Sequence, residues 1–242
     1  MFPLKDNIQA RSFPVVNIGL IGINIVFFLY QMSYGHRVDE LILAFGFIPA
    51  RFFAQQAEGW LNLSTYMPVF SSMFLHANLI HLISNMWMLW IFGDNVEDCM
   101  GHGRYLLFYL LCGIASVAAQ AIANPQSAIP MIGASGAISG VLGAYFLTYP
   151  HARILTLLPI FILFYLIELP AYFFLGFWFV MQFVQGSLYT MNSDRIVGGG
   201  VAWWAHVGGF AAGVILLQLF RCKDWQRPVI QSEKRIRRIN RR

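Results

Sequence analysis

Charged residues are scarce in this chain. Only 11% of its 242 residues are Asp, Glu, Lys or Arg, whereas 58% are hydrophobic. A soluble domain usually carries about twice that charged fraction. Apolar runs near the length that spans a bilayer, roughly 17–25 residues, recur along the sequence. Because these runs are continuous rather than alternating, they indicate a helical membrane protein with several spans.

Cysteine offers no framework for disulfides or for a metal. Cys99, Cys112 and Cys222 are widely separated and odd in number, which fits neither a set of disulfides nor the spacing of a zinc site. A cleavable leader is also not indicated, because the apolar run that begins at Val15 has no clear small-residue cleavage site after it. We therefore expect a retained first helix and no metal.

Six spans are expected from the apolar runs. The region from Ile154 to Gly186 is too long for one span and contains Pro159 and Pro170, so its first part is expected to be a bent or interfacial lead-in. The long loop before the second span contains apolar groups too short to span, which predicts short helices in the membrane interface. The expected spans cover about residues 15–32, 77–96, 105–123, 131–149, 169–186 and 199–220.

Basic residues are divided unevenly between the loops. With both termini in the cytoplasm, thirteen Lys and Arg lie on the cytoplasmic side and only Arg37, Arg51 and Arg195 on the outer side. The positive-inside rule therefore favours this orientation. The predicted fold is an all-α six-helix bundle at 15–220, between a cytoplasmic segment at 1–14 and a basic tail at 221–242. The tail is interpreted as a topology anchor on anionic lipid, not as a nucleic-acid site.

Polar side chains inside spans are costly and are therefore candidates for function. His81 and Asn85 lie four residues apart in "HANLIHLISNMW", on one helical face. Ser135 lies in "GASG", and His206 lies in "AWWAHVGGFAAG". From the helical rise and the bilayer thickness, Ser135 lies about 8 Å and His206 about 10 Å below the outer surface. Groups from three helices are thus expected to share one layer of the outer leaflet.

This set of side chains suits acyl transfer. Ser135 needs a base to become a nucleophile, and His206 can supply it as a dyad, because no acid is expected at that depth. His81, Asn85 and the exposed backbone donors around Gly133 and Ser135 would stabilise the oxyanion.

Small residues line one side of two of the predicted helices. Gly136 and Gly140 follow Ser135 at helical spacing, and Gly209 and Gly213 form a GxxxG pattern after His206. Such faces let helices approach closely, which would bring His206 to Ser135.

Each of these features has a simpler interpretation when it stands alone. Ser135 could be a helix cap, and His206 could make an interhelical hydrogen bond. His76, at the membrane interface, is expected to be structural. Ser139 is a rival nucleophile one turn deeper, but it lacks the flanking glycines. Glu168 is interpreted as an interface group rather than as part of a proton relay.

The combination of motifs resembles the rhomboid family of intramembrane serine proteases. The match rests on "HANLIHLISN", on "GASG" at the start of a short fourth helix and on "AHVGGFAAG" in the sixth. The resemblance implies a Ser135–His206 dyad, an oxyanion site at His81, Asn85 and the Ser135 amide, and no cofactor. It also implies single-span membrane proteins as substrates, cut near their outer end, in a bacterial-type inner membrane with the site open to the periplasmic side.

The sequence departs from some members of this family. A Trp-Arg pair before the second helix is missing from "PVFSSMFLH", and Ser139 stands where some members have an aromatic residue that stacks on the histidine. His206 must therefore be held in another way. Two alternatives remain: a relative that binds membrane helices without cutting them, which would be expected to lack Ser135 or His206, and a transporter. The chain shows no internal repeat, which disfavours the transporter.

Overall fold

Six helices of 14 to 22 residues form the body of the described part of the molecule. The computed structural model describes residues 1–56, 63–191 and 201–221, so Arg195, Gly199 and the tail beyond Arg221 lie outside the described residues. Each long helix coincides with one of the expected spans. Their bounds are α1 (Val15–Ser33), α5 (Leu79–Met100), α6 (His102–Ala123), α7 (Ser135–Thr148), α8 (Ala171–Met191) and α9 (Trp203–Phe220).

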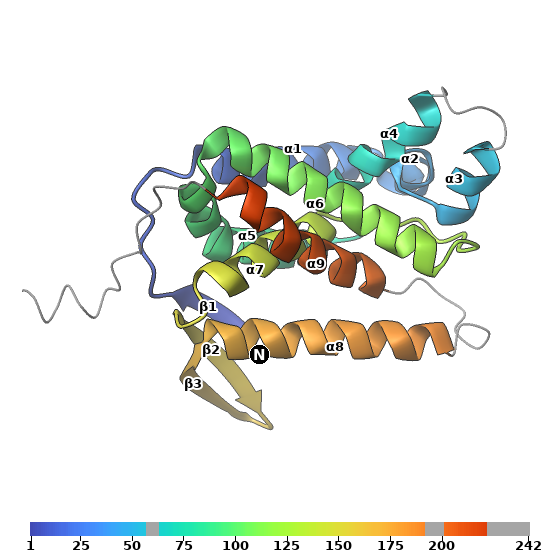
Figure 1. Ribbon diagram of the computed structural model, residues 1–242. Coiled ribbons are helices and arrows are strands. Elements are labelled where there is room, and N and C mark those ends of the chain that lie inside the picture. Colours follow the sequence, from blue (N-terminus) through green and yellow to red (C-terminus); the bar gives the residue numbers. More distant parts are fainter. Residues whose placement is uncertain (57–62, 192–200, 222–242) are drawn as a thin grey trace, which may run out of the picture.

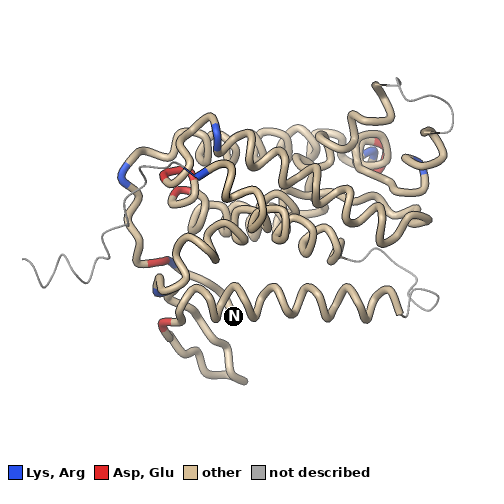
Figure 2. The backbone as a smooth tube through the Cα atoms, in the orientation of Figure 1, with Lys and Arg blue, Asp and Glu red and all other residues tan. Residues whose placement is uncertain are grey.

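Four of these helices, α1, α6, α8 and α9, are long and apolar enough to cross a membrane. Helix α5 makes a fifth candidate span together with residues Leu63–Phe74, which meet it at a bend of 80°. Helix α7 has only 14 residues. Figure 2 shows the charged residues at the two ends of the bundle and none along the middle of the helices. The prediction of a mostly helical, multi-pass membrane protein is confirmed.

Short helices occupy the loop between α1 and α5. Two single 3₁₀ turns, η1 (Gly35–Arg37) and η2 (Ser72–Phe74), accompany α2 (Val38–Phe45), α3 (Pro49–Gln56) and α4 (Leu63–Ser71). They gather at one end of the bundle (Figure 1). Phe47 in this loop pairs through its backbone with Met131, so the loop is joined to the segment that precedes α7. Short helices in this loop agree with the expectation from its short apolar groups.

A three-stranded antiparallel sheet corrects the all-α prediction. Strands β1 (Phe2–Asp6), β2 (Arg153–Ile160) and β3 (Leu163–Pro170) lie in the order β1-β2-β3. The segment that was expected to be a bent lead-in is the β2–β3 hairpin, and α8 begins at Ala171 directly after it. Figure 1 shows the sheet next to the start of α8, projecting beyond the bundle.

Local chemistry explains why this segment is a hairpin and not a helix. It is rich in β-branched and aromatic residues, which favour strands. Pro159 would break a helix, but it lies in β2 beyond the residues that pair with β1, so its missing N–H removes no bond to that strand. Phe161, at the turn, has a φ of 54°. The hairpin therefore satisfies backbone groups that a proline-interrupted helix would leave unpaired.

Strand β1 is tied to the bundle through Asp6. One carboxylate oxygen of Asp6 accepts hydrogen bonds from Nδ2 of Asn95, at 2.9 Å, and from the hydroxyl of Tyr145. Burial, opposed by the hydrogen bond from Tyr145 and assisted by the nearby carboxyl of Asp94, raises the pKa of Asp6 to about 7. The sheet, α5 and α7 are thereby joined at one buried polar cluster.

The closest helix crossing in the core is between α7 and α9. A Cβ atom added to Gly209 would lie 2.0 Å from the carbonyl oxygen of Gly136, and one added to Gly213 would lie 2.0 Å from that of Gly140. No side chain fits at that distance, so the two backbones touch through glycine. This crossing fixes the relative position of the first turns of α7 and α9.

Candidate active site

Ser135 and His206 meet between the N-terminal ends of α7 and α9. Ser135 is the first residue of α7, and His206 is the fourth residue of α9, which begins at Trp203. Oγ of Ser135 lies 2.8 Å from Nε2 of His206, within hydrogen-bonding distance. His206 thus lies in the first turn of α9 as the structure describes it. A hydroxyl and a neutral imidazole in this geometry form a nucleophile and a base.

The other ring nitrogen of His206 is held by α8. Its Nδ1 lies 2.7 Å from Oε1 of Gln182, a buried residue. The rings of Trp178 and Trp203 lie 5.9 and 6.3 Å from the imidazole, measured between centroids. Sequence reasoning missed Gln182 and Trp178. The signal for Gln182 was available, because an amide within the apolar stretch "FWFVMQFV" is as unusual as a histidine there.

The hydroxyl of Ser139 is hydrogen-bonded within its own helix. Its hydroxyl donates to the carbonyl oxygen of Ser135 at 2.6 Å, and its side chain is buried inside the bundle. A serine one turn into a helix often makes this bond to the preceding turn. The geometry therefore offers Ser135, and not Ser139, to the imidazole.

His81 and Asn85, in the first two turns of α5, line the same pocket as Ser135 and His206. The backbone N–H of Ala77 donates to Nδ1 of His81 at 3.4 Å, so Nε2 of the neutral ring carries its hydrogen. Nδ2 of Asn85 is buried and has no hydrogen-bond partner among the described residues. Ser135 starts α7, so its N–H has no acceptor within the helix. Three donors are thus available around the serine.

Gly133 and His76 both adjoin His81, but only Gly133 lines the pocket. The N–H of Gly133, expected among the oxyanion donors, is instead given to the carbonyl oxygen of Ser72 at 2.9 Å. Gly133 has a φ of 118°, and a Cβ there would lie 2.7 Å from the ring of His81, so only glycine fits. His76 is fully buried and packs edge-on against His81, at 5.1 Å between centroids.

The remaining glycines make room for neighbouring helices. A Cβ on Gly136 would lie 2.1 Å from the hydroxyl of Ser116 in α6, and one on Gly140 would lie 2.4 Å from Cys112. Helix α7 is therefore pressed between α6 and α9 on its small-residue sides. This packing leaves Ser135 little freedom to move.

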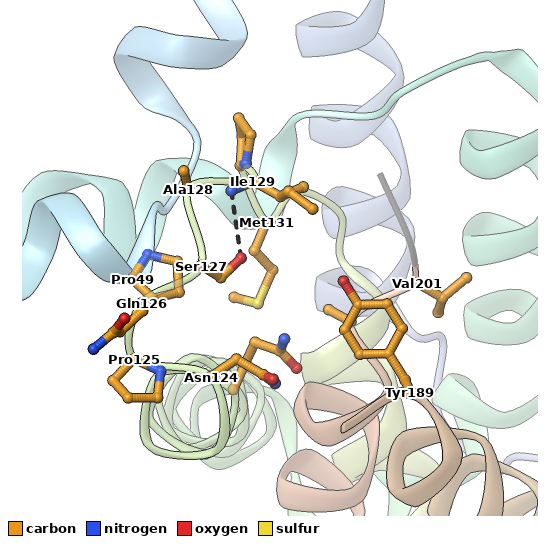
Figure 3. A pocket seen from close by; sticks show the side chains of 13 residues that line it. Pro49, Asn124, Pro125, Gln126, Ser127, Ala128, Ile129, Met131, Tyr189 and Val201 are labelled. Carbon is orange, nitrogen blue, oxygen red and sulfur yellow. Dashed lines mark hydrogen bonds between the residues drawn. The ribbon is translucent and has the colours of Figure 1, made fainter. Parts of the chain in front are cut away.

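The pocket around the dyad has a volume of about 530 Å³. Its lining, as far as the structure describes it, includes His81, Asn85, Ser135 and His206 and no Asp, Glu, Lys or Arg. A second pocket of about 420 Å³ adjoins it, between Pro49, Tyr189 and the segment 124–131 (Figure 3). The two pockets share Ile129, Pro130, Met131, Val201 and Ala202. In the described ranges, no three His, Cys, Asp or Glu side chains gather as metal ligands.

Comparison with known proteins identifies the family. A Rhomboid domain matches residues 63–222, more than half of the chain. Rhomboid protease GluP of Bacillus subtilis (strain 168) is 38% identical over 120 residues, which are 50% of this chain and 22% of that protein. Rhomboid protein 1, mitochondrial, of Saccharomyces cerevisiae is 27% identical over 157 residues, 63% of this chain and 41% of that protein.

A third relative is the presenilin-associated rhomboid-like protein, mitochondrial, of Homo sapiens. It is 32% identical over 97 residues, 39% of this chain and 26% of that protein. The chain spans less than half the length of each of these relatives. The resemblance expected from the three motifs is confirmed: the chain belongs to the rhomboid family.

Proposed function

We propose that this chain is an intramembrane serine endopeptidase that cuts transmembrane segments of other membrane proteins. The observation that carries the proposal is the 2.8 Å contact between Oγ of Ser135 and Nε2 of His206, inside a pocket at the outer ends of the helices. The match to the Rhomboid domain and to a protein named Rhomboid protease GluP supports it.

The proposed reaction is acyl transfer to Ser135 followed by hydrolysis. Nε2 of His206 takes the proton of the Ser135 hydroxyl as Oγ attacks the scissile carbonyl carbon. Nδ2 of Asn85, Nε2–H of His81 and the N–H of Ser135 stabilise the oxyanion of the tetrahedral intermediate. His206 then gives its proton to the leaving amine. A water molecule, deprotonated by His206 in the same way, cleaves the acyl-enzyme and restores the hydroxyl of Ser135.

The proposed orientation places both termini in the cytoplasm and the dyad toward the outer, periplasmic face of a bacterial-type inner membrane. Figure 2 supports it, since it shows Lys and Arg gathered at the end of the bundle opposite the short helices. In this proposal the peptidase domain covers residues 15–220 with six spans. The short helix α7 spans only part of the membrane thickness, so Ser135 lies below the outer surface.

The proposed substrates are single-span membrane proteins. The substrate segment around the scissile bond must unwind into an extended conformation to reach Ser135 and His206. The pocket around these residues shares lining residues with a second pocket. Substrate residues next to the cut would occupy both. Helix α8 borders the site and carries bulky, exposed side chains such as Phe177, Phe183 and Leu188, and in this proposal a substrate helix enters from the lipid past α8.

The test is cleavage of model single-span substrates by the purified protein in liposomes. Wild type should cut, Ser135→Ala and His206→Ala should lose cleavage by at least about 10³-fold, and the matched control Ser139→Ala should still cut. The second candidate, a non-cleaving binder of membrane helices, would replace the proposal if wild type cuts none of several substrates. Cleavage by Ser135→Ala at the wild-type rate would show that Ser135 is not the nucleophile.

A further inference from the structure

Gln182 is a polar side chain in the apolar helix α8. It is 8% exposed, and its Oε1 lies 2.7 Å from Nδ1 of His206. Burying an amide in apolar surroundings is unfavourable unless the amide is hydrogen-bonded. Leucine or phenylalanine would pack at this position without that requirement. The bond to His206 is therefore the feature that distinguishes Gln182 from its apolar neighbours on α8.

The direction of this hydrogen bond selects one form of the imidazole. Oε1 of Gln182 can only accept, so Nδ1 of His206 carries the hydrogen. In the neutral ring, Nε2 then has the free lone pair, and Nε2 is the atom that lies 2.8 Å from Oγ of Ser135. The opposite tautomer would place two lone pairs face to face at Gln182. It would also turn an N–H toward the serine, where a base is needed.

We propose that Gln182 is a positioning residue for His206, an uncharged counterpart of the carboxylate in a catalytic triad. The proposal rests on the proposed protease function. When the proton of Ser135 moves to Nε2, the Nδ1–H of the imidazolium keeps its bond to Oε1 of Gln182. The proton then passes from Nε2 to the leaving amine, and Gln182 neither gains nor loses a proton. The bond keeps the ring in the orientation and tautomer that the reaction requires.

Trp178 supports the same assignment, because it precedes Gln182 by one helical turn. Its ring lies 5.9 Å from that of His206, with 38° between the ring planes. Gln182 and Trp178, two of the groups next to the imidazole, thus both come from α8, whereas position 139 of α7 holds a serine bonded to its own helix. Displacement of α8 from α9 would break the bond from Gln182. Helix α8 therefore governs the orientation of the base as well as bordering the site.

The test compares the cleavage activity of two variants of Gln182. If Gln182 only fills space, the apolar variant should be the more active; if it positions His206, the variant that keeps an acceptor should be. Gln182→Met keeps the size and suits apolar surroundings but lacks the acceptor, while Gln182→Glu keeps the acceptor and adds a charge. We expect Gln182→Met to lower kcat by about 10- to 100-fold, the effect of an unpaired buried donor, with KM nearly unchanged. Gln182→Glu should retain more activity than Gln182→Met. Ser187→Ala is the matched control, because among the described residues the hydroxyl of half-buried Ser187 on α8 bonds only to the carbonyl oxygen of Phe183 in its own helix.

Labelling of Ser135 by a fluorophosphonate gives a second readout, because it needs the same deprotonation but no substrate helix. Slow labelling of Gln182→Met, restored in Gln182→Glu, would support the positioning role. If wild type is neither labelled nor active, the proposed protease function fails. If wild type is active and Gln182→Met matches it, or if Gln182→Glu is the worse variant, the positioning role fails and the protease function stands. Gln182→Asn, too short to reach Nδ1, replaces Gln182→Met if that variant does not fold.

Discussion

At the scale of single residues, the distance between Ser135 and His206 is set by glycine at the α7–α9 crossing. The contact between the two side chains depends on how closely their helices approach. That approach is limited by backbone atoms, since a Cβ on Gly213 would meet the carbonyl oxygen, carbonyl carbon and Cα of Gly140 at 2.0, 2.6 and 2.7 Å. Backbone atoms cannot rotate away as a side chain can. A methyl group at this position therefore has to separate the helices.

We expect Gly213→Ala to lower the free energy of unfolding by roughly 1–3 kcal/mol or more, the usual effect of overpacking. Cleavage should fall as well, because Ser135 and His206 would move apart. Gly19→Ala is the matched control, because a Cβ on Gly19, in α1, has no atom within 4 Å and alanine favours a helix. Thermal unfolding and cleavage of both variants check this. Wild-type stability of Gly213→Ala would contradict the backbone contact.

Single residues also show how far the site could be predicted from the sequence. Ser135, His206, His81 and Asn85 were expected in one layer, and they line one pocket. Their positions within the predicted helices were enough to place them at a similar depth. Gln182 was missed because its direction depends on the rotation of α8 about its own axis, which periodicity in an almost wholly apolar helix does not reveal. The hydrogen bond that occupies the N–H of Gly133 lies between two loops, which no local pattern predicts.

At the scale of elements, the helices were predictable and the sheet was not. Long apolar runs can span a membrane only as helices or closed barrels, so the runs gave the positions of α1, α5, α6, α8 and α9 to within a few residues. The segment that forms the β2–β3 hairpin is also apolar, although it is not helical. A short apolar run does not by itself distinguish a strand from a buried helix. Its partner β1 lies about 150 residues away in the sequence, so the pairing is not a local property.

The apolar tip of the hairpin leads to a prediction about its surroundings. Phe161, Ile162 and Phe164 are 100%, 89% and 70% exposed, while the charged residues Arg153 and Glu168 stand at the base. Figure 2 shows this separation, with no charge toward the tip. An exposed apolar patch joined directly to a membrane-spanning helix is expected to lie among lipids. We therefore expect the tip to insert into the interface of the cytoplasmic leaflet.

A nitroxide attached at Phe161→Cys measures this insertion, in a Cys222→Ser background that leaves Cys99 and Cys112, which are buried. In liposomes the label should be more accessible to oxygen than to a water-soluble nickel complex. A label at Glu168→Cys, at the base of the same hairpin, should show the reverse order. Equal accessibility of the two sites to the nickel complex would place the tip in water and contradict the prediction.

At the scale of the whole molecule, one partly buried carboxyl connects the sheet to the bundle. Asp6 of β1 accepts hydrogen bonds from Asn95 of α5 and Tyr145 of α7. Strand β1 pairs with β2, and β3 leads directly into α8, so the start of α8 is tied to the rest of the protein partly through Asp6. The protonation state of this residue is thus expected to affect the stability of the assembled fold.

The sign of that effect follows from the direction of the shift. Burial raises the pKa of Asp6 from 3.8 to about 7, so between these values the folded protein binds a proton that the unfolded chain does not. The stabilisation is complete below pH 3.8 and is lost as the pH rises through about 7. The unfolding temperature of wild type should therefore decrease from pH 5 to pH 8, by roughly 2–4 °C for each kcal/mol lost.

Replacing Asp6 separates its contribution from that of the other titrating groups. Asp6→Asn keeps a side-chain oxygen for the hydroxyl of Tyr145 but cannot ionise, so its unfolding temperature should vary less with pH. The gain of the variant over wild type should grow between pH 5 and pH 8, because Asp6 then carries a charge in a poorly solvated position next to Asp94. Asp39→Asn, which removes an exposed carboxyl in α2, should keep the wild-type profile. Parallel profiles for wild type and Asp6→Asn would show that Asp6 does not change its protonation state between pH 5 and pH 8, and would contradict the prediction.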